Sequence, residues 1–314
     1  MKATRQEYRP DPDFGRVRDF FADTFHPAET RFNWRIDRWN YARYFVMPMI
    51  GMDGRTDAPI EDGLRTIRFW EEHTAIWETE TGEIVGVVAL EYPWHGDAFP
   101  MRRPGYDQIL PELLDYSETV LMHREKRTLS IHIYDHDQAF QALARERGYQ
   151  KNEEYLEEDS VYPIDRIPDP GLPEGYGIRS MADESDIERR REVFGRAFNH
   201  VDPAEWPSAF SYQELQRAPD YRPEQDLFIV SQDGRYVACC IVWHDEVNKI
   251  GILEPVGTHP DFRRRGLGQE VVMEGIRQAA SRGATEVWVG SGQRFYEAIG
   301  FEKRAICYTW TKRF

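Results

Sequence analysis

The C-terminal half of the chain alternates apolar and polar positions in a regular order. Three apolar runs bounded by turn residues predict strands at residues 226–230, 236–245 and 250–258. From Leu267 onward, apolar residues recur with a period near 3.6, which predicts an amphipathic helix ending at Gly283. The later pattern predicts a buried strand, a short helix and a final strand, at residues 285–289, 293–299 and 305–310. The order of elements is α/β, with most strands before the long helix.

The two halves of the chain share a pattern, which suggests an internal duplication. Residues 74–91 and 226–245 each hold two apolar runs around a glycine turn and predict β-hairpins. Gly82 and Gly234 are 152 positions apart, and so are Gly148 and Gly300. Chance remains an alternative because glycine is common, but the matching flanks favour a repeat.

A proline- and glycine-rich stretch separates these halves. Residues 165–177 read DRIPDPGLPEGYG and lack apolar periodicity, as expected of a linker between domains. We therefore predict a domain at 1–165, a linker at 166–177 and a second domain at 178–314.

Composition predicts a soluble, cytoplasmic protein. The longest strongly apolar run, residues 237–243, is too short to cross a bilayer. Three cysteines, an odd number in a long chain without a secretory signal, argue against a disulfide framework. The net charge of −15 disfavours nucleic acid as a partner, so any anionic ligand must be held by a local cluster of donors.

Such a cluster occurs between a predicted strand and the long predicted helix. Residues 258–272 read THPDFRRRGLGQEVV, with three arginines followed by Gly266 and Gly268. A helix start leaves backbone N–H groups unpaired and carries partial positive charge, which suits a phosphate. Glycine allows a ligand to approach the backbone closely, so this loop is interpreted as a pyrophosphate cradle.

In this context the loop resembles the acyl-CoA motif of the GNAT superfamily of N-acyltransferases, in which Arg-x-x-Gly-x-Gly opens a helix after a strand. FYEAIGF, residues 295–301, is similar to the later helix of that superfamily, where a tyrosine faces the sulfur of CoA. The resemblance covers about residues 176–314, and the order of both motifs makes it specific. It implies two tandem GNAT-like domains, each a central, mostly antiparallel sheet flanked by helices in a mixed α/β (α+β) fold.

The resemblance also implies a set of acetyl-CoA contacts. The backbone of residues 256–258 would run beside the pantetheine arm, and the amides of residues 264–269 would bind the pyrophosphate. The implied contact residues are Val256, Gly257, Thr258, Arg263, Arg264, Arg265, Gly266, Leu267, Gly268 and Gln269.

Two residues are candidates for the chemistry. By resemblance, Tyr296 would protonate the departing thiolate as a general acid, whereas the alternative is a ring that only packs in the core. Glu254 lies among apolar residues of the strand before the cradle. It is either a desolvated base that accepts the amine proton or a structural acceptor for loop amides.

The first half of the chain lacks this chemistry. At the 152-residue offset the cradle corresponds to PELLDY, residues 111–116, and the nearby MRRPGY contains Pro104, which has no N–H to donate. The position of Tyr296 corresponds to Ala144. We expect a degenerate GNAT-like domain that does not bind CoA and has a structural or substrate-shaping role.

The sequence thus predicts acetyl transfer from acetyl-CoA to a primary amine by direct attack in a ternary complex. The rival hypothesis is a non-catalytic acyl-CoA-binding sensor or interaction protein. His132 and His136 lack the pattern of a metal motif, so no metal is expected. By resemblance, residues 206–225 would wall the acceptor pocket. Neither the acceptor, a small molecule or a peptide, nor the oligomeric state follows from the sequence.

Overall fold

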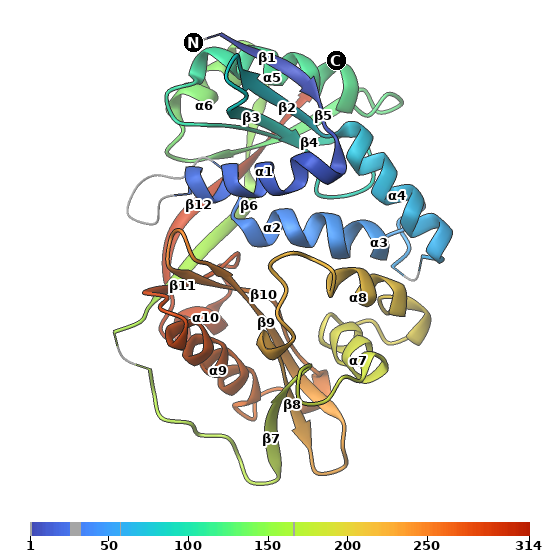
Figure 1. Cartoon of the computed structure of the whole chain (residues 1–314), viewed down its shortest axis with the longest axis vertical. Coiled ribbons are helices and arrows are strands. Elements are labelled where there is room, and N and C mark those ends of the chain that lie inside the picture. Colours follow the sequence, from blue (N-terminus) through green and yellow to red (C-terminus); the bar gives the residue numbers. More distant parts are fainter. Residues whose placement is uncertain (1, 26–32, 57, 166) are drawn as a thin grey trace. The chain divides into compact units, whose positions relative to one another are not determined.

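The computed structural model describes residues 2–25, 33–56, 58–165 and 167–314. The chain forms two compact units that interleave along the sequence (Figure 1). Unit 1 contains the residues up to Met47, Leu64–Glu158 and Ala305–Phe314, and unit 2 contains Pro48–Gly63 and Asp159–Arg304. These units are not the contiguous segments predicted at 1–165 and 178–314. Met1 and Arg166, which begin the first predicted domain and the linker, lie outside the described residues.

The sheet of unit 1 is antiparallel except for one parallel pair, β4 with β5. In spatial order its strands are β1 (Ala3–Glu7), β2 (Ala75–Thr79), β3 (Ile84–Ala89), β4 (Asp97–Arg102), β5 (Thr128–Tyr134) and β12 (Glu302–Arg313). The helices in this part of the sequence are α1 (Pro10–Thr24), α2 (Ile36–Tyr41), α3 (Met47–Met49), α4 (Ile60–His73), α5 (Leu110–Tyr116) and α6 (Gln138–Glu146). Tryptophans are among the largest buried side chains of the core, where the rings of Trp39 and Trp70 lie 4.6 Å apart.

The sheet of unit 2 has the same design. Its only parallel pair in the described residues joins β10 and β11, and its other pairs are antiparallel. In spatial order the strands are the end of β6 (Gln150–Pro163), β11 (Glu286–Val289), β10 (Ile250–Thr258), β9 (Tyr236–Asp245), β8 (Asp226–Ser231) and β7 (Tyr176–Ser180). The helices are α7 (Ile187–Ala197), α8 (Ala209–Leu215), α9 (Leu267–Ser281) and α10 (Arg294–Ala298).

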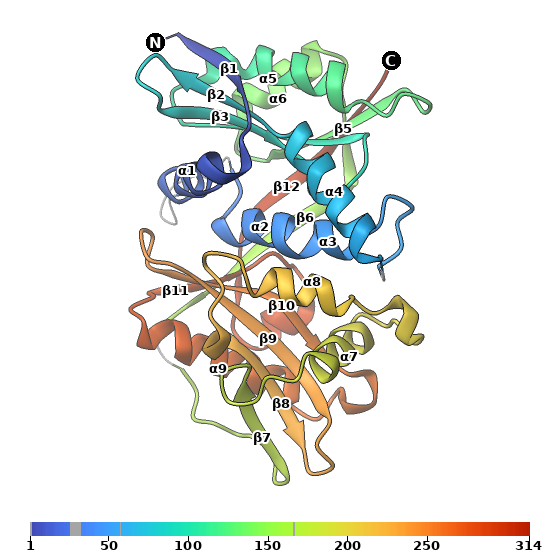
Figure 2. The same ribbon diagram turned by 45° about the vertical axis from the view of Figure 1, so that its right-hand side comes forward.

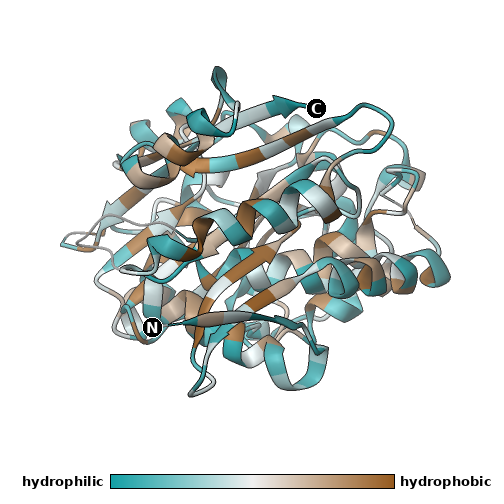
Figure 3. Cartoon of the chain, turned by 90° about the horizontal axis from the view of Figure 1, so that it is seen from above, coloured by the Kyte–Doolittle hydropathy of each residue, from teal (hydrophilic) through white to brown (hydrophobic). Residues whose placement is uncertain are grey.

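Helices cover both faces of the sheet in unit 2 (Figure 2). On one face, Gly275 of α9 packs so closely on β9 and β10 that a Cβ would meet Val242 at 3.1 Å and Leu253 at 3.2 Å. On the other, the end of α7 meets β10, where a Cβ on Gly257 would come within 2.5 Å of Ala197. Hydrophobic residues accordingly follow the strands and the inner helix faces (Figure 3).

The elements predicted for the C-terminal half are confirmed, because strong periodicity and glycine stops mark each of them. The predicted strands at 236–245 and 250–258 coincide with β9 and β10, and the long predicted helix is α9. Both halves of the chain also follow one order, in which helices separate the first two strands, α1 to α4 in the first half and α7 and α8 in the second, and a helix joins the parallel pair. The tandem, mixed α/β architecture with a mostly antiparallel sheet is therefore confirmed.

The two repeats exchange their last strands. We call the part of the chain from β1 to β6 the first repeat and the part from β7 to β12 the second. From Ser160 to Pro163, β6 pairs with β11 of the second repeat. From Cys307 to Arg313, β12 pairs with β5 of the first repeat. Each repeat therefore completes the sheet of the other, which explains why the compact units interleave.

The predicted linker lies against α9. The backbone N–H of Gly171 donates to the Glu270 carboxylate at 3.0 Å, and Arg277 donates to the Pro168 carbonyl at 3.2 Å. Gly171 and Pro168, which belong to unit 2, are thus hydrogen-bonded to its helix α9. Within the described residues, no helix is long and apolar enough to cross a membrane.

Candidate functional site

The candidate site begins where β10 and β11 part. These strands pair in parallel at Ile250, Gly251 and Ile252, and no later β10–β11 pair occurs in the described residues. On its other side β10 stays paired with β9 to Thr258, with an irregularity between Leu253 and Val256. The split leaves the backbone of residues 256–258 next to a gap in the ladder, where an extended ligand can pair with it.

A loop then leads from β10 to α9. It contains a short 3-10 turn, Pro260–Phe262, and two residues with positive φ, Arg264 at 60° and Gly266 at 83°. Gly266 is the N-cap of α9 and offers no side-chain hydrogen bond to the helix. The first N–H groups of α9 therefore remain available to an anion, which the helix dipole also favours.

The three arginines of this loop have different surroundings. Arg263 and Arg265 donate hydrogen bonds to backbone oxygens of the loop itself, Thr258 at 3.1 Å and Asp261 at 2.9 Å. The exposed Arg264 side chain has no hydrogen bond or ion pair with another described residue. Of the three, Arg264 is the guanidinium that can bind an incoming anion without giving up a protein partner.

The two glycines of the motif are required for different reasons. Gly266 has open space around its missing Cβ, so its positive φ is what favours glycine. Gly268 is packed, because a Cβ there would meet Thr258 Oγ1 at 2.8 Å and Phe295 at 3.5 Å. The sequence interpretation, which assigned both glycines to ligand approach, did not include this contact between α9, the end of β10 and α10.

Tyr296 lies on α10 with only 6% of its surface exposed. Its ring packs edge-on against Phe295 and Phe301, with centroids 5.0 and 5.3 Å away. Burial, followed by the charges of Glu254 and Cys240, raises the pKa of the Tyr296 phenol. The ring packs in the core, as the packing alternative expects. The phenol oxygen has no hydrogen-bond partner in the described residues, so its O–H stays free to donate.

Glu254 is half-buried on β10, near enough to Tyr296 for its charge to affect the phenol. Its backbone oxygen accepts a hydrogen bond from Trp243 Nε1 at 2.7 Å. This bond lies at the irregularity in the β9–β10 ladder and fixes the backbone there. The structure thus brings Glu254, Tyr296 and the loop together within unit 2.

A buried polar network that the sequence did not indicate anchors the helices on the α7 face. The wholly buried Arg190 of α7 pairs with Asp226 of β8 at 2.8 Å and donates to Tyr212 Oη of α8 at 2.9 Å. Tyr221 donates to the other Asp226 oxygen at 3.0 Å. Although burial opposes the charged form, Asp226 and Tyr212 raise the pKa of Arg190, which stays a cation. The network joins the predicted acceptor wall, residues 206–225, to the sheet.

In the first repeat, the loop after β4 carries its own ion pairs instead of free donors. The buried Arg102 pairs with Asp137 at 2.6 Å and with Asp107 at 2.6 Å. This loop precedes α5, and residues 111–116, which the offset of 152 made the counterpart of the predicted cradle, are helical. The offset fails because β4 is shorter than β10. Pro111 in the first turn of α5 also removes one N–H donor.

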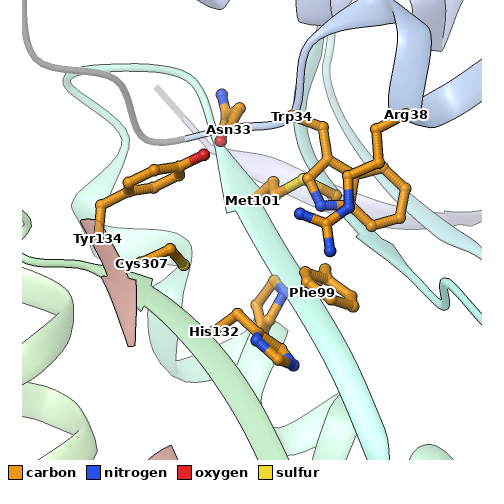
Figure 4. Close-up of a pocket in the computed structure, with 9 residues that line it drawn as sticks. Asn33, Trp34, Arg38, Phe99, Met101, His132, Tyr134 and Cys307 are labelled. Carbon is orange, nitrogen blue, oxygen red and sulfur yellow. The ribbon is translucent and has the colours of Figure 1, made fainter. Parts of the chain in front are cut away.

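The split between β4 and β5 is filled by side chains (Figure 4). Their parallel pairing ends at Ala98 and Ile131. Beyond it the Phe99 ring stacks on His132 at 4.2 Å, and Arg38 lies 4.6 Å from the Phe99 ring centre. The small cavity that remains is lined by Asn33, Trp34, Arg38, Phe99, Pro100, Met101, His132, Tyr134 and Cys307. Ala144, the counterpart of Tyr296, is buried and carries no polar group.

In the described part of the chain, no group of three or more His, Cys, Asp or Glu side chains is placed to hold a metal ion. His132, one of the two histidines considered above, instead pairs with Asp97 at 2.7 Å.

Comparison with known proteins points to one family. The profile of the acetyltransferase (GNAT) family matches residues 189–301. A mycothiol acetyltransferase of Saccharomonospora viridis is 25% identical over 85% of this chain and 92% of its own length. An uncharacterized N-acetyltransferase of Methanocaldococcus jannaschii and a mycothiol acetyltransferase of Thermobispora bispora are each 27% identical, over 44% and 45% of this chain. Those two alignments span only 65% and 51% of the relatives' lengths.

Solved structures share the fold. A tandem GNAT protein from the clavulanic acid biosynthesis pathway aligns over 99% of this chain and 98% of its own, with a TM-score of 0.63 and 15% identity. A GCN5-related N-acetyltransferase from Sphaerobacter thermophilus aligns over 90% of this chain and 94% of its own, with a TM-score of 0.56 and 18% identity.

Proposed function

The chain is a tandem GNAT protein whose second repeat carries the acetyltransferase domain, and from this premise we propose that it transfers an acetyl group from acetyl-CoA to a primary amine. The observation that carries the proposal is the Tyr296 phenol. It is buried close to Glu254 and has no hydrogen-bond partner in the described residues. In the sequence it follows β10 and β11, whose pairing ends early, and α9, whose first turn has no side-chain cap.

The residues of unit 2 fit an acyl-CoA. The backbone N–H groups of Leu267, Gly268 and Gln269 at the start of α9, together with Arg264, would hold the pyrophosphate. The backbone of residues 256–258 would pair with the amides of the pantetheine arm along the gap beside β10. Arg263 and Arg265, which are engaged by loop carbonyls, support the loop rather than contribute free charge.

Acetyl-CoA supplies a thioester that a neutral amine can attack directly. Glu254, half-buried on β10, accepts a proton from the attacking amine. Tyr296 Oη donates its proton toward the leaving sulfur. Its raised pKa keeps it protonated at neutral pH, and the same apolar surroundings raise the proton affinity of the sulfur. Glu254 remains open to the alternative role of structural acceptor.

The acceptor is best sought among amines related to mycothiol, because relatives that match this chain carry the name mycothiol acetyltransferase. The net charge of −15 favours the encounter with a cationic amine but does not select one. We place the reaction in a reducing cytoplasm, where the three buried, free cysteines would remain thiols.

The second candidate is a non-catalytic acyl-CoA sensor, which the packing of the Tyr296 ring supports. Incubation with acetyl-CoA and a panel of primary amines, including mycothiol precursors, separates the two functions. Free thiol released in proportion to added amine supports the transferase. Saturable CoA binding without amine-dependent thiol release would establish the sensor.

A further inference from the structure

Arg263 makes more protein contacts than a phosphate ligand requires. Its Nε donates to the Thr258 carbonyl at 3.1 Å, at the end of β10. Its Nη2 donates to the Ala197 carbonyl at 2.7 Å and to Asn199 Oδ1 at 3.0 Å. One planar guanidinium thus connects the end of β10 to the last turn of α7 in the same unit, and Ala197 in that turn lies 66 positions before Arg263.

The α7 turn held in this way has a specific conformation. Asn199 has a φ of 67°, a left-handed conformation that asparagine tolerates better than most residues. Its N–H donates to the Arg196 carbonyl at 3.0 Å, which ends the helix. The backbone of Asn199 makes this bond, and its side-chain oxygen accepts a hydrogen bond from Arg263 instead.

This turn presents an aromatic ring to the edge of β10. The Phe198 ring comes within 3.8 Å of the position that a Cβ on Gly257 would take, and Ala197 comes within 2.5 Å. Phe198 nevertheless remains 45% exposed, with its inner side against Phe194 at a centroid distance of 4.6 Å. Residues 256–258 pair with β9 but, in the described residues, not with β11. The large exposed Phe198 ring therefore forms one apolar wall of the slot beside β10 that we propose for the pantetheine arm.

We propose that Arg263 is a positioning residue that braces the α7 turn against β10, so that Phe198 walls the slot for the pantetheine arm, while Arg264 alone among the three loop arginines binds the pyrophosphate through its side chain. This inference rests on the proposed function. Replacing Arg263 should therefore weaken binding of the pantetheine arm, whereas replacing Arg264 should weaken binding of the pyrophosphate.

The test is equilibrium binding of two probes to the full-length chain, measured by calorimetry. CoA carries both the pantetheine arm and the pyrophosphate, whereas 3′-phospho-ADP keeps the pyrophosphate and the nucleotide but lacks the pantetheine arm. Arg264→Ala should weaken both probes by about tenfold, as expected for the loss of a charge-assisted hydrogen bond. Arg263→Ala should weaken CoA by about fivefold and 3′-phospho-ADP by less than about twofold.

Asn199→Gly provides a variant that keeps all three arginines. Glycine accepts the positive φ and removes the side chain whose oxygen Arg263 binds, while the Arg263 bond to the Ala197 carbonyl remains. CoA affinity should therefore fall by about two- to threefold while 3′-phospho-ADP affinity stays unchanged. Thermal melting of each variant confirms folding. Arg263→Ala that weakens 3′-phospho-ADP as much as Arg264→Ala would overturn the assignment, and so would wild-type CoA affinity in both Arg263→Ala and Asn199→Gly. A wild-type chain that binds no CoA would instead refute the proposed function.

Discussion

Tyr296 is the residue at which catalysis and packing can be separated. Tyr296→Phe keeps the ring contacts with Phe295 and Phe301 and removes one oxygen without a protein partner in the described residues. If the hydroxyl protonates the leaving sulfur, turnover should fall by about ten- to a thousandfold while CoA affinity changes little. Steady-state thiol release at saturating donor and amine measures the first quantity, and calorimetry the second. Turnover within twofold of wild type would leave Tyr296 a packing residue.

Replacing Gly266 tests whether the start of α9 binds the pyrophosphate, and Gly283, just after the end of α9, provides a matched control. Gly266 and Gly283 both have positive φ, 83° and 89°, and both have open space where a Cβ would lie. Alanine at either position should therefore cost about 1–2 kcal/mol of stability through backbone strain. Only Gly266→Ala should weaken CoA binding, because only Gly266 shapes the helix start that we propose to bind the pyrophosphate. Equal CoA affinity in the two folded variants would place the anion elsewhere.

Single-residue roles were the part of the site that the sequence predicted least well. The motif identified the loop and its arginines, but it could not show that Arg263 is engaged by the Ala197 carbonyl, 66 positions earlier. Nor could it show that Gly268 packs against Thr258. Both features depend on contacts between segments distant in sequence, which local patterns do not encode.

Among the secondary-structure elements, α7 and α8 depend on the buried Arg190–Asp226 pair for their attachment to β8. Arg190→Met leaves a buried carboxylate without its cation and should lower the free energy of unfolding by about 3–5 kcal/mol. Arg282→Met is the control, since Arg282 pairs with Glu224 at 2.6 Å on the surface and should contribute less than about 1 kcal/mol. Urea denaturation measures both. Similar losses in the two variants would mean that the buried network does not anchor these helices.

Elements with strong periodicity were predicted almost to the residue. Apolar runs between turn residues defined β9 and β10, and glycines marked the end of α9 and of the short helix before β12. The first repeat was harder, because the fixed offset placed the cradle on residues 111–116, which form α5. A difference in strand length between β4 and β10 is not visible in hydrophobicity alone.

At the scale of the whole molecule, the duplication was predictable and the exchange of the last strands was not. Matching hairpins and glycines revealed two repeats, whereas pairing of β12 with β5 joins residues between 173 (Cys307 with Tyr134) and 185 (Arg313 with Thr128) positions apart. Strand partners that distant are selected by the complete sheet and not by local sequence. The contiguous domains predicted from the sequence therefore could not anticipate the interleaved units.

The duplication gives two similar repeats, and we propose that only the second of them holds the acyl-CoA. In the second repeat the helix start is uncapped and the strands part, whereas in the first repeat Arg102 is paired with acids and Phe99 and His132 fill the split. Calorimetric titration of the full-length chain with CoA tests this directly. We expect one equivalent of CoA to bind per chain, and changes at Arg264 and Gly266 should abolish or weaken this binding. Two equivalents, or one that is unaffected by these changes, would contradict it.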